Sequence, residues 1–145
     1  IVRGICCLKT GIPGLSENIT VRSIVGNFLE HARIFYFYND GFEDVYMGSA
    51  DWMPRNLDKR VEITFPVEDE DLKKRVIEIL EIQLSDTLKA HILQPDGTYE
   101  KQDLRGREKL EAQAYFCKQA MGALKEDDKK KVSRIFIPRM KIGDQ

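Results

Sequence analysis

The sequence predicts an α/β fold, in which helices pack on a mixed β-sheet. Two runs rich in aromatic and β-branched residues, 32–37 and 44–50, flank the turn-forming triplet Asn-Asp-Gly at 39–41, and together they predict an antiparallel hairpin. The clearest helix is expected over 68–86, where apolar residues recur at helical spacing: Leu72, Val76, Ile79, Leu80 and Leu84.

The composition is that of a globular domain. The 145 residues fit one domain with a real core, and 42% hydrophobic with 32% charged residues is ordinary for this class. The net charge of -1 excludes a uniformly basic surface, so an anionic partner would have to be held locally. No apolar run is long enough to span a bilayer, and no signal-peptide pattern is present. Because the chain opens at Ile1 in an apparent strand and without Met, we expect a fragment of a longer protein.

The cysteines are Cys6, Cys7 and Cys117. Their odd number, with two of them adjacent in an apolar run, argues against a disulfide framework and for a reducing compartment. Their spacing suits no zinc site. The sequence also contains no Walker A loop, no Rossmann glycine fingerprint and no metal-binding helix motif.

Short strands and loops are expected before the hairpin. Residues 1–8 are apolar apart from Arg3 and predict a buried strand, in which Arg3 either lies at the strand end or holds an anionic group. Residues 9–18 contain two glycines and a proline and predict a loop. A short strand is expected at 19–24, followed by one or two helical turns at 26–30.

After the hairpin, Pro54 and Asn56 indicate a loop, and residues 60–65 alternate as a strand that Pro66 ends. The helix at 68–86 begins with an acidic turn, which the helix dipole favours. The remaining expected elements are a strand at 89–93, a turn at 95–97, an amphipathic helix at 107–121 capped by Gly122, a solvated charge run at 125–131 and an edge strand at 132–137.

His31 and Arg33 form an H-x-R pattern at the entrance to the first hairpin strand. Residues two apart on a strand point to the same face, so the imidazole and the guanidinium can meet one phosphate. The imidazole can donate a proton or attack phosphorus. The alternatives are a surface histidine that caps a helix end and a solvent-facing arginine.

The return strand ends at Gly48-Ser49-Ala50-Asp51-Trp52, which the hairpin places at the same end as His31. Backbone amides and Ser49 could cradle an anion there. The alternative is an ordinary turn with Trp52 as a plug in the core.

Four polar residues alternate after this turn and would share one face of the next strand: Asn56, Asp58, Arg60 and Glu62. Such a face is usually just solvated. It is also typical of an ion-pair network, which could orient His31 by fixing its tautomer. The other histidine, His91, is expected to be structural or exposed.

Three stretches resemble one family: VRGICCLKTGIPGLSENITVRSIVGNFLEHARIFYFYNDG, VYMGSADWMPRNLDKRVEITFPV and LEAQAYF. They are similar to the C-terminal domain of bacterial polyphosphate kinase, the long ATP-dependent type. The resemblance covers residues 1–121 as a catalytic-half domain and leaves 122–145 as a charged C-terminal tail.

The resemblance implies a phospholipase D-like fold. Here H-x-R followed by GSAD stands where the phospholipase D pattern has H-x-K followed by GSxN. Arg33 replaces the lysine and Asp51 replaces the asparagine, which weakens any assignment as a phosphodiesterase.

The family reaction is the reversible transfer of the terminal phosphate of ATP to polyphosphate through a phosphohistidine in the preceding domain, with Mg²⁺ bound mainly by that domain. The resemblance makes Arg3 and His31 phosphate- and nucleotide-binding residues, with His31 catalytic, and this chain supplies no metal ligand. Lower-ranked supporting residues are Arg33, Ser49, Asp51, Arg55 and Asn56. The implied partners are ATP or ADP, polyphosphate and the preceding domain, in a homo-oligomer without nucleic acid. The implied location is cytoplasmic, with membrane association of the full-length protein left open.

Two other functions remain open at this point. One is a phospholipase D-like phosphodiesterase that acts as a homodimer, and the other is a non-catalytic module that binds polyanions. The fragment itself is expected to be inactive alone, because half of the active-site constellation would be missing.

Overall fold

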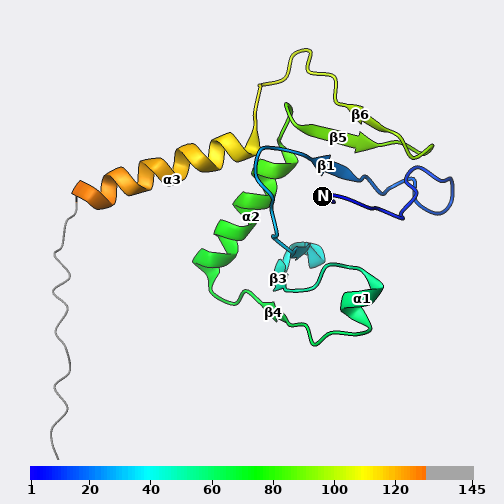
Figure 1. The fold of residues 1–145 in the computed structure, drawn as a ribbon, viewed down its shortest axis with the longest axis horizontal. Coiled ribbons are helices and arrows are strands. Elements are labelled where there is room, and N and C mark those ends of the chain that lie inside the picture. The colour runs from blue at the N-terminus through cyan, green and yellow to red at the C-terminus, as the bar shows by residue number, and fades with distance from the viewer. Residues whose placement is uncertain (130–145) are drawn as a thin grey trace, which may run out of the picture. The chain divides into compact units, whose positions relative to one another are not determined.

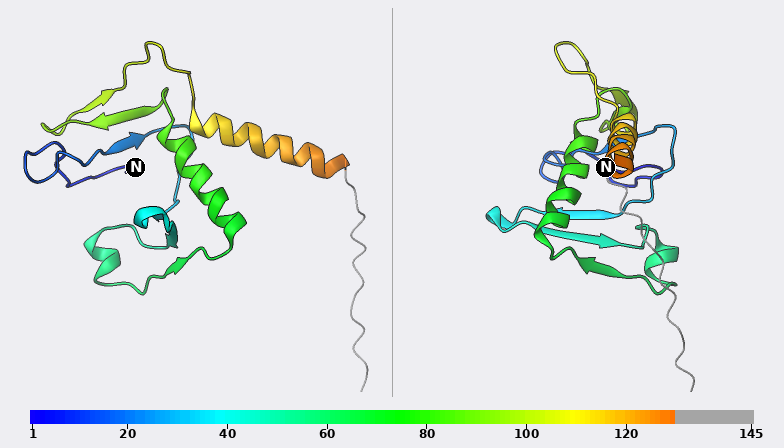
Figure 2. Two further views of the ribbon diagram at one scale, coloured as in Figure 1. Left: turned by 180° about the vertical axis from the view of Figure 1, so that it is seen from behind. Right: turned by 90° about the vertical axis from the view of Figure 1, so that its left-hand side faces the viewer.

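The computed structural model describes residues 1–129 of the chain (Figure 1). One sheet in this part has the strand order β2-β3-β4, with β2 at Ile34–Phe37, β3 at Asp44–Gly48 and β4 at Thr64–Pro66. All its pairings are antiparallel, and Phe35 lies opposite Tyr46 while Tyr46 lies opposite Pro66. The right-hand view of Figure 2 shows these strands side by side. The predicted hairpin is confirmed.

The second sheet has the order β1-β5-β6, with β1 at Arg22–Ile24, β5 at Ala90–Leu93 and β6 at Tyr99–Lys101. It too is antiparallel throughout. The prediction of one mixed sheet is therefore wrong for residues 1–129. A parallel pair needs a crossover that returns the chain to the same sheet, whereas here the segment after β4 leads to the other sheet. β6 was not expected, although the turn at 95–97 that joins it to β5 was.

Helix α2 (Glu70–Leu84) links the two sheets along the chain and confirms the clearest predicted helix (Figure 1). Its N-cap is Asp69, whose carboxylate accepts hydrogen bonds from the backbone amides of Asp71 and Leu72. This is the capping that the free amides of a first helical turn require. A single turn of 3-10 helix, η1 (Asn39–Gly41), closes the hairpin.

The apolar run at 1–8 does not form the predicted buried strand. Its backbone makes one hydrogen bond to β1, from the amide of Val2 to the carbonyl of Arg22 at 2.8 Å. Ile5 is 90% exposed. The other edge of β1 is already paired with β5, and a single bond does not make a ladder. Arg3 is consequently an exposed residue and not a charge inside a buried strand.

Two further local predictions are wrong. Residues 26–30 are not helical, because the backbone amide and carbonyl of Phe28 form hydrogen bonds with the side chain of Gln113 and not with helical neighbours. The expected loop at 54–56 contains a short helix, α1 (Pro54–Leu57), and the next strand begins only at Thr64. The polar residues expected to alternate along a strand lie in and after α1, so the predicted strand-borne ion-pair network is absent there: Asn56, Asp58, Arg60 and Glu62.

The first compact unit of the chain is Ile1–Gln113, and a second unit begins at Ala114. Helix α3 (Ala112–Lys129) begins five residues later than expected and runs through Gly122, which is therefore not a cap. The rest of the charge run and the strand expected at 132–137 lie outside the described residues. Within residues 1–129, no helix is long and apolar enough to cross a membrane.

The core of the described part is small. Its buried apolar residues are Val21, Ile24, Val45, Ala50, Val76, Ala90, Leu93 and Ala112. None of these is aromatic, and polar residues are buried among them. The aromatic side chains of the hairpin thus lie outside the core.

Candidate functional site

Arg33 and Asp51 form an ion pair at the end of the hairpin. The guanidinium donates from Nε at 3.0 Å and approaches with Nη2 at 2.8 Å, both to Oδ1 of Asp51. Arg33 also donates from Nη1 to the backbone carbonyl of His31 at 2.9 Å. Arg33 thus contacts both His31 and Asp51, which the hairpin was predicted to place at the same end.

The ion pair changes the acidity of Asp51. The hydrogen bond from Arg33 holds the pKa of the Asp51 carboxyl below its usual range, and the charge of His31 adds a smaller effect in the same direction. A carboxylate stabilised in this way stays ionised. His31 itself is exposed, so its ring is accessible from solvent.

The segment that precedes His31 is held from two sides. Arg3 donates from Nη1 to the carbonyl of Phe28 at 2.7 Å. The side-chain amide of Gln113 donates from Nε2 to the same carbonyl at 2.8 Å. Its Oε1 accepts a hydrogen bond from the backbone amide of Phe28 at 3.0 Å. Arg3 is therefore brought to the segment that carries His31, although it comes from a loop and not from a strand.

Glu30, directly before His31, is bound by two buried glutamines. Gln113 donates to one carboxylate oxygen at 2.7 Å, and Gln83 of α2 donates to the other at 2.6 Å. Both glutamines are less than one-tenth exposed, at 6% and 8%. This support was missed in the sequence. One signal was present, because Gln83 follows Ile79 and Leu80 at helical spacing and so interrupts the apolar face of the predicted helix.

Gly26 makes the approach of Gln113 possible. A Cβ atom at this position would lie 2.1 Å from Oε1 of Gln113, far inside contact distance. The glycine is needed for space and not for an unusual backbone angle, since its φ is not in the left-handed region. Gly26, Gln113, Glu30 and Phe28 thus form one arrangement that fixes the backbone before His31.

Ser49 has its partners inside the chain. Its hydroxyl donates to Glu62 and accepts from the Ile63 amide at 3.0 Å, while its own amide donates to the Ile63 carbonyl at 3.0 Å. These bonds attach the end of β3 to the segment before β4. The amide and hydroxyl that were expected to cradle an anion are therefore already engaged.

Asn56 is 2% exposed and lies under the turn at 51–53. Its Nδ2 donates to the backbone carbonyl of Asp51 at 3.2 Å, while its Oδ1 is buried without a hydrogen-bond partner. Asn56 thus supports the residue that pairs with Arg33. Arg55, on the same short helix, is exposed.

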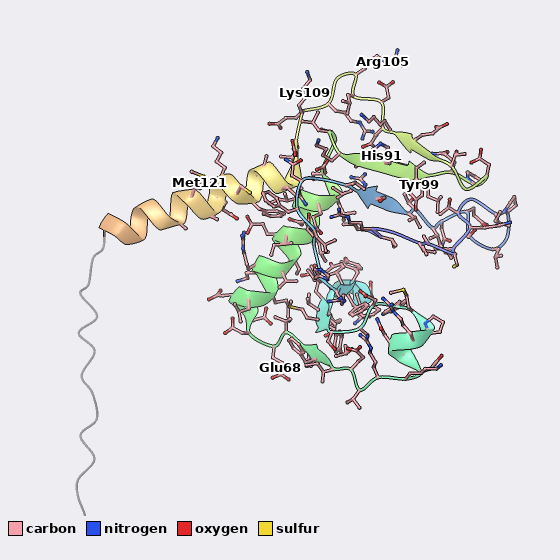
Figure 3. All side chains as sticks on the ribbon, in the orientation of Figure 1. Glu68, His91, Tyr99, Arg105, Lys109 and Met121 are labelled. Carbon is pink, nitrogen blue, oxygen red and sulfur yellow. The ribbon has the colours of Figure 1, made fainter. Side chains whose placement is uncertain are left out.

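The site contains no evident metal centre. Residues 1–129 hold no group of three or more His, Cys, Asp or Glu side chains placed to bind a metal ion. The three cysteines are free thiols. His91 lies on β5, in the sheet that does not contain the hairpin (Figure 3). Its Nδ1 contacts the carbonyl of Lys89 at 3.1 Å.

The chain is similar to known proteins over most of its length. A family profile described as "Polyphosphate kinase C-terminal domain 2" matches residues 1–113. The polyphosphate kinase of Lactiplantibacillus plantarum is 52% identical over 127 residues, which cover 88% of this chain and 18% of the relative. That of Pseudomonas putida is 62% identical over 99 residues, covering 68% of this chain and 14% of the relative.

A solved structure agrees with the sequence relatives. The crystal structure of polyphosphate kinase from Porphyromonas gingivalis matches with a TM-score of 0.77 and 40% identity, over 85% of this chain and 19% of the solved one. The chain thus spans less than a fifth of the length of these relatives. With a profile matched over residues 1–113 and this agreement in fold, the chain belongs to the polyphosphate kinase family, in which it corresponds to C-terminal domain 2.

Proposed function

We propose that this chain supplies one wall of an ATP:polyphosphate phosphotransferase site. In this proposal the terminal phosphate of ATP is transferred reversibly to inorganic polyphosphate, through a phosphohistidine that a neighbouring domain provides. The observation that carries the proposal is the exposed His31, whose backbone is held through Arg33, Glu30 and Phe28 in a chain with polyphosphate kinase relatives.

Phosphoryl transfer depends mainly on positioning and on stabilising charge that spreads over the transferred phosphate. Arg3 supplies a permanent positive charge near the His31 segment, and its Nη1 is the nitrogen that holds Phe28. Its remaining donors can bind phosphate oxygens in a fork. The protonated imidazole of His31 can donate a hydrogen bond to the same group or return a proton to it.

The supporting residues act on the backbone of His31. Arg33 holds the carbonyl of His31, Asp51 holds Arg33, and Asn56 holds the carbonyl of Asp51. Arg55 is exposed next to them and is free to meet an anionic substrate. Ser49 contributes by attaching β3 to the following segment.

Several family properties are part of the proposal. Mg²⁺ is assigned to the neighbouring domain, as the family resemblance implies, and no step is assigned to it here. The fold is taken as half of a phospholipase D-like arrangement, residues 1–121 as its domain and 122–145 as a tail. The full-length protein is taken as a cytoplasmic homo-oligomer.

The test compares the isolated chain with the same chain inside a full-length enzyme. The region that matches in the Lactiplantibacillus plantarum polyphosphate kinase would be replaced by this chain, giving a chimera. ATP-dependent polyphosphate synthesis is expected from the chimera and not from the isolated chain. Robust synthesis by the isolated chain would contradict the proposal.

Two further assays on the isolated chain address the other two functions. A homodimeric phosphodiesterase would hydrolyse a phosphodiester such as bis-p-nitrophenyl phosphate as the isolated chain, and would lose this activity in His31→Ala. Arg33 disfavours it, because its guanidinium is paired with Asp51 and bound to the His31 carbonyl. A non-catalytic module would bind polyphosphate with a strong salt dependence that His31→Ala leaves unchanged.

A further inference from the structure

One face of the β2-β3-β4 sheet is aromatic and open. Side chains alternate between the faces of a strand, so Phe35, Phe37 and their cross-strand neighbour Tyr46 share a face. Trp52 adds its ring to that face by stacking on Phe35, with ring centroids 5.4 Å apart and planes at 22°. We call Phe35, Phe37, Tyr46 and Trp52 the aromatic face.

The opposite face of the sheet is the covered one. Val45 points that way and is 2% exposed, and α2 contacts β3. Tyr36 points the same way, because it alternates with Phe35 and Phe37 along β2. Its hydroxyl donates a hydrogen bond to Glu43, which raises the pKa of Tyr36 to about 12, and the charge of Glu81 on α2 adds a smaller effect in the same direction. The sheet therefore has its helix on one side, and the aromatic face is left without a covering element in the described residues.

The aromatic face carries a shallow, open depression of about 530 Å³. The depression is lined by Phe35, Phe37, Asn39, Asp44, Tyr46, Trp52 and Thr64. Trp52 is 76% exposed and Phe37 is 51% exposed. A one-sided antiparallel sheet normally turns polar residues to water. Aromatic residues on both faces of β2 are typical of a strand that is buried on both sides.

We propose that the aromatic face packs against the part of a polyphosphate kinase polypeptide that precedes the region matched by this chain. This inference rests on the proposed function and adds the surface on which that neighbouring part docks. The relatives carry more than four-fifths of their length outside the matched region, which supplies an occupant of the right size. The described core is small and lacks aromatic residues, so the chain alone leaves its largest apolar side chains in water.

The ring geometry disfavours a nucleobase as the occupant. A base held between two rings needs a gap of about 7 Å, which is two van der Waals separations. Phe35 and Trp52 are already stacked on each other, and Phe37 meets Tyr46 edge-on with centroids 6.1 Å apart. These rings form a continuous layer, as in one half of a packed core, and not a slot.

The docking surface ends at the candidate site. Arg33 precedes Phe35 by two residues and so lies on the same face, and Asp51 precedes Trp52. A polypeptide that covers the aromatic face would therefore have its edge beside the Arg33–Asp51 ion pair. The catalytic residues of the neighbouring part would reach the His31 side of the hairpin across this edge.

Hydroxyl-radical footprinting read by mass spectrometry tests the docking surface. The isolated chain and the chimera would be labelled side by side, and Trp52 and Phe37 should be oxidised about tenfold more slowly in the chimera, as for side chains in an interface core. Phe42, which is 82% exposed at the hairpin tip, is the matched control and should keep its rate. Unchanged rates at Trp52 and Phe37 in the chimera would overturn the proposal.

Two measurements on the isolated chain separate the other occupants. Protection of Trp52 that grows with protein concentration would indicate a second copy, and protection by ATP alone would indicate a nucleotide; either result overturns the proposal. The open face should also bind the dye ANS, and Phe37→Ser with Trp52→Ser should remove most of this binding, whereas Phe42→Ser should not. An isolated chain that binds no ANS would contradict an open aromatic face even if the chimera does not fold.

Footprinting needs no catalysis, so the two proposals can fail separately. A chimera that protects Trp52 but makes no polyphosphate would contradict the proposed function alone. A chimera that makes polyphosphate while Trp52 stays fully reactive would contradict the docking surface alone.

Discussion

Arg33 binds Asp51 through two nitrogens that meet a single carboxylate oxygen, Oδ1, at 3.0 and 2.8 Å. This contact holds the pKa of Asp51 below its usual range. Removing the guanidinium in Arg33→Gln should therefore raise the pKa of Asp51 toward its ordinary value, and Arg33→Lys should raise it less. The pKa of Asp51 is measured from the NMR chemical shift of its carboxyl carbon in a titration from about pH 2 to 6, which covers an ordinary aspartate titration.

The sign of the stability effect follows from the same shift. Because the pKa of Asp51 is lower in the folded chain, its ionised form favours folding. This contribution is fully present above the unfolded-state pKa of about 3.9 and is lost as the pH falls through the folded pKa. Asp51→Asn should therefore lower stability at neutral pH and approach the parent chain at low pH. If Asp51→Asn lowered the free energy of unfolding by the same amount at neutral and at low pH, this account would be contradicted.

Gly26→Ala tests the close approach of Gln113. The new Cβ would lie 2.1 Å from Oε1, so the buried amide must move and lose bonds to Phe28 and Glu30. Overpacking of this kind should cost about 1–3 kcal/mol in the free energy of unfolding, measured by urea denaturation. Gly122→Ala is the control, because nothing lies within 4 Å of its added Cβ and it is inside α3. That variant should be stabilised by up to about 1 kcal/mol.

Asp86 is a buried junction between α2, β5 and the start of α3. It is 0% exposed, and its carboxylate accepts from the amides of Lys89, Ala90 and Ala112 at 2.7, 3.1 and 2.8 Å. Asp86→Asn replaces one acceptor oxygen by a donor and leaves at least one buried amide unpaired, which should cost about 2–4 kcal/mol. Thermal unfolding of Asp58→Asn, an exposed position, should stay within about 0.5 kcal/mol of the parent. If Asp86→Asn and Asp58→Asn were equally stable, Asp86 would not be the buried acceptor that joins these three elements.

Gln113 is predicted to be a positioning residue for the site. Gln113→Ala in the chimera frees the Phe28 amide and one oxygen of Glu30, and so releases the backbone before His31. We expect kcat for polyphosphate synthesis to fall about tenfold, with a smaller change in the KM for ATP. Gln113→Glu should not restore activity, since it places a second carboxylate against Glu30. Gln94→Ala, in the β5–β6 turn, is the control.

What could be predicted from the sequence was local. The hairpin depends on the turn at 39–41 and on alternation in adjacent residues, and α2 depends on spacing within one segment. The hairpin also predicts that His31 and Asp51 lie at the same end, although the pairing of Arg33 with Asp51 was not predicted. The resemblance of the sequence also predicted membership of the polyphosphate kinase family, which the comparisons with known proteins confirm.

What could not be predicted depends on contacts between distant segments. Gln113 reaches Phe28 and Glu30 across more than eighty residues, and Gly26 is needed only because Gln113 is there. The apolar run at 1–8 predicted burial, yet in this chain it is largely exposed, because its neighbour β1 is short and already paired. Apolar sequence shows that a segment needs a partner and does not show where the partner is.

The central claim is that His31 works in phosphoryl transfer from this wall of a composite site. The most direct measurement is the rate of ATP-dependent polyphosphate synthesis by the chimera with His31→Ala, with His91→Ala as the matched control on the other sheet. The account predicts a loss of at least about a hundredfold for His31→Ala, the usual minimum for an acid–base group, and near-parent activity for His91→Ala. A His31→Ala chimera that synthesises polyphosphate at the parent rate would contradict it.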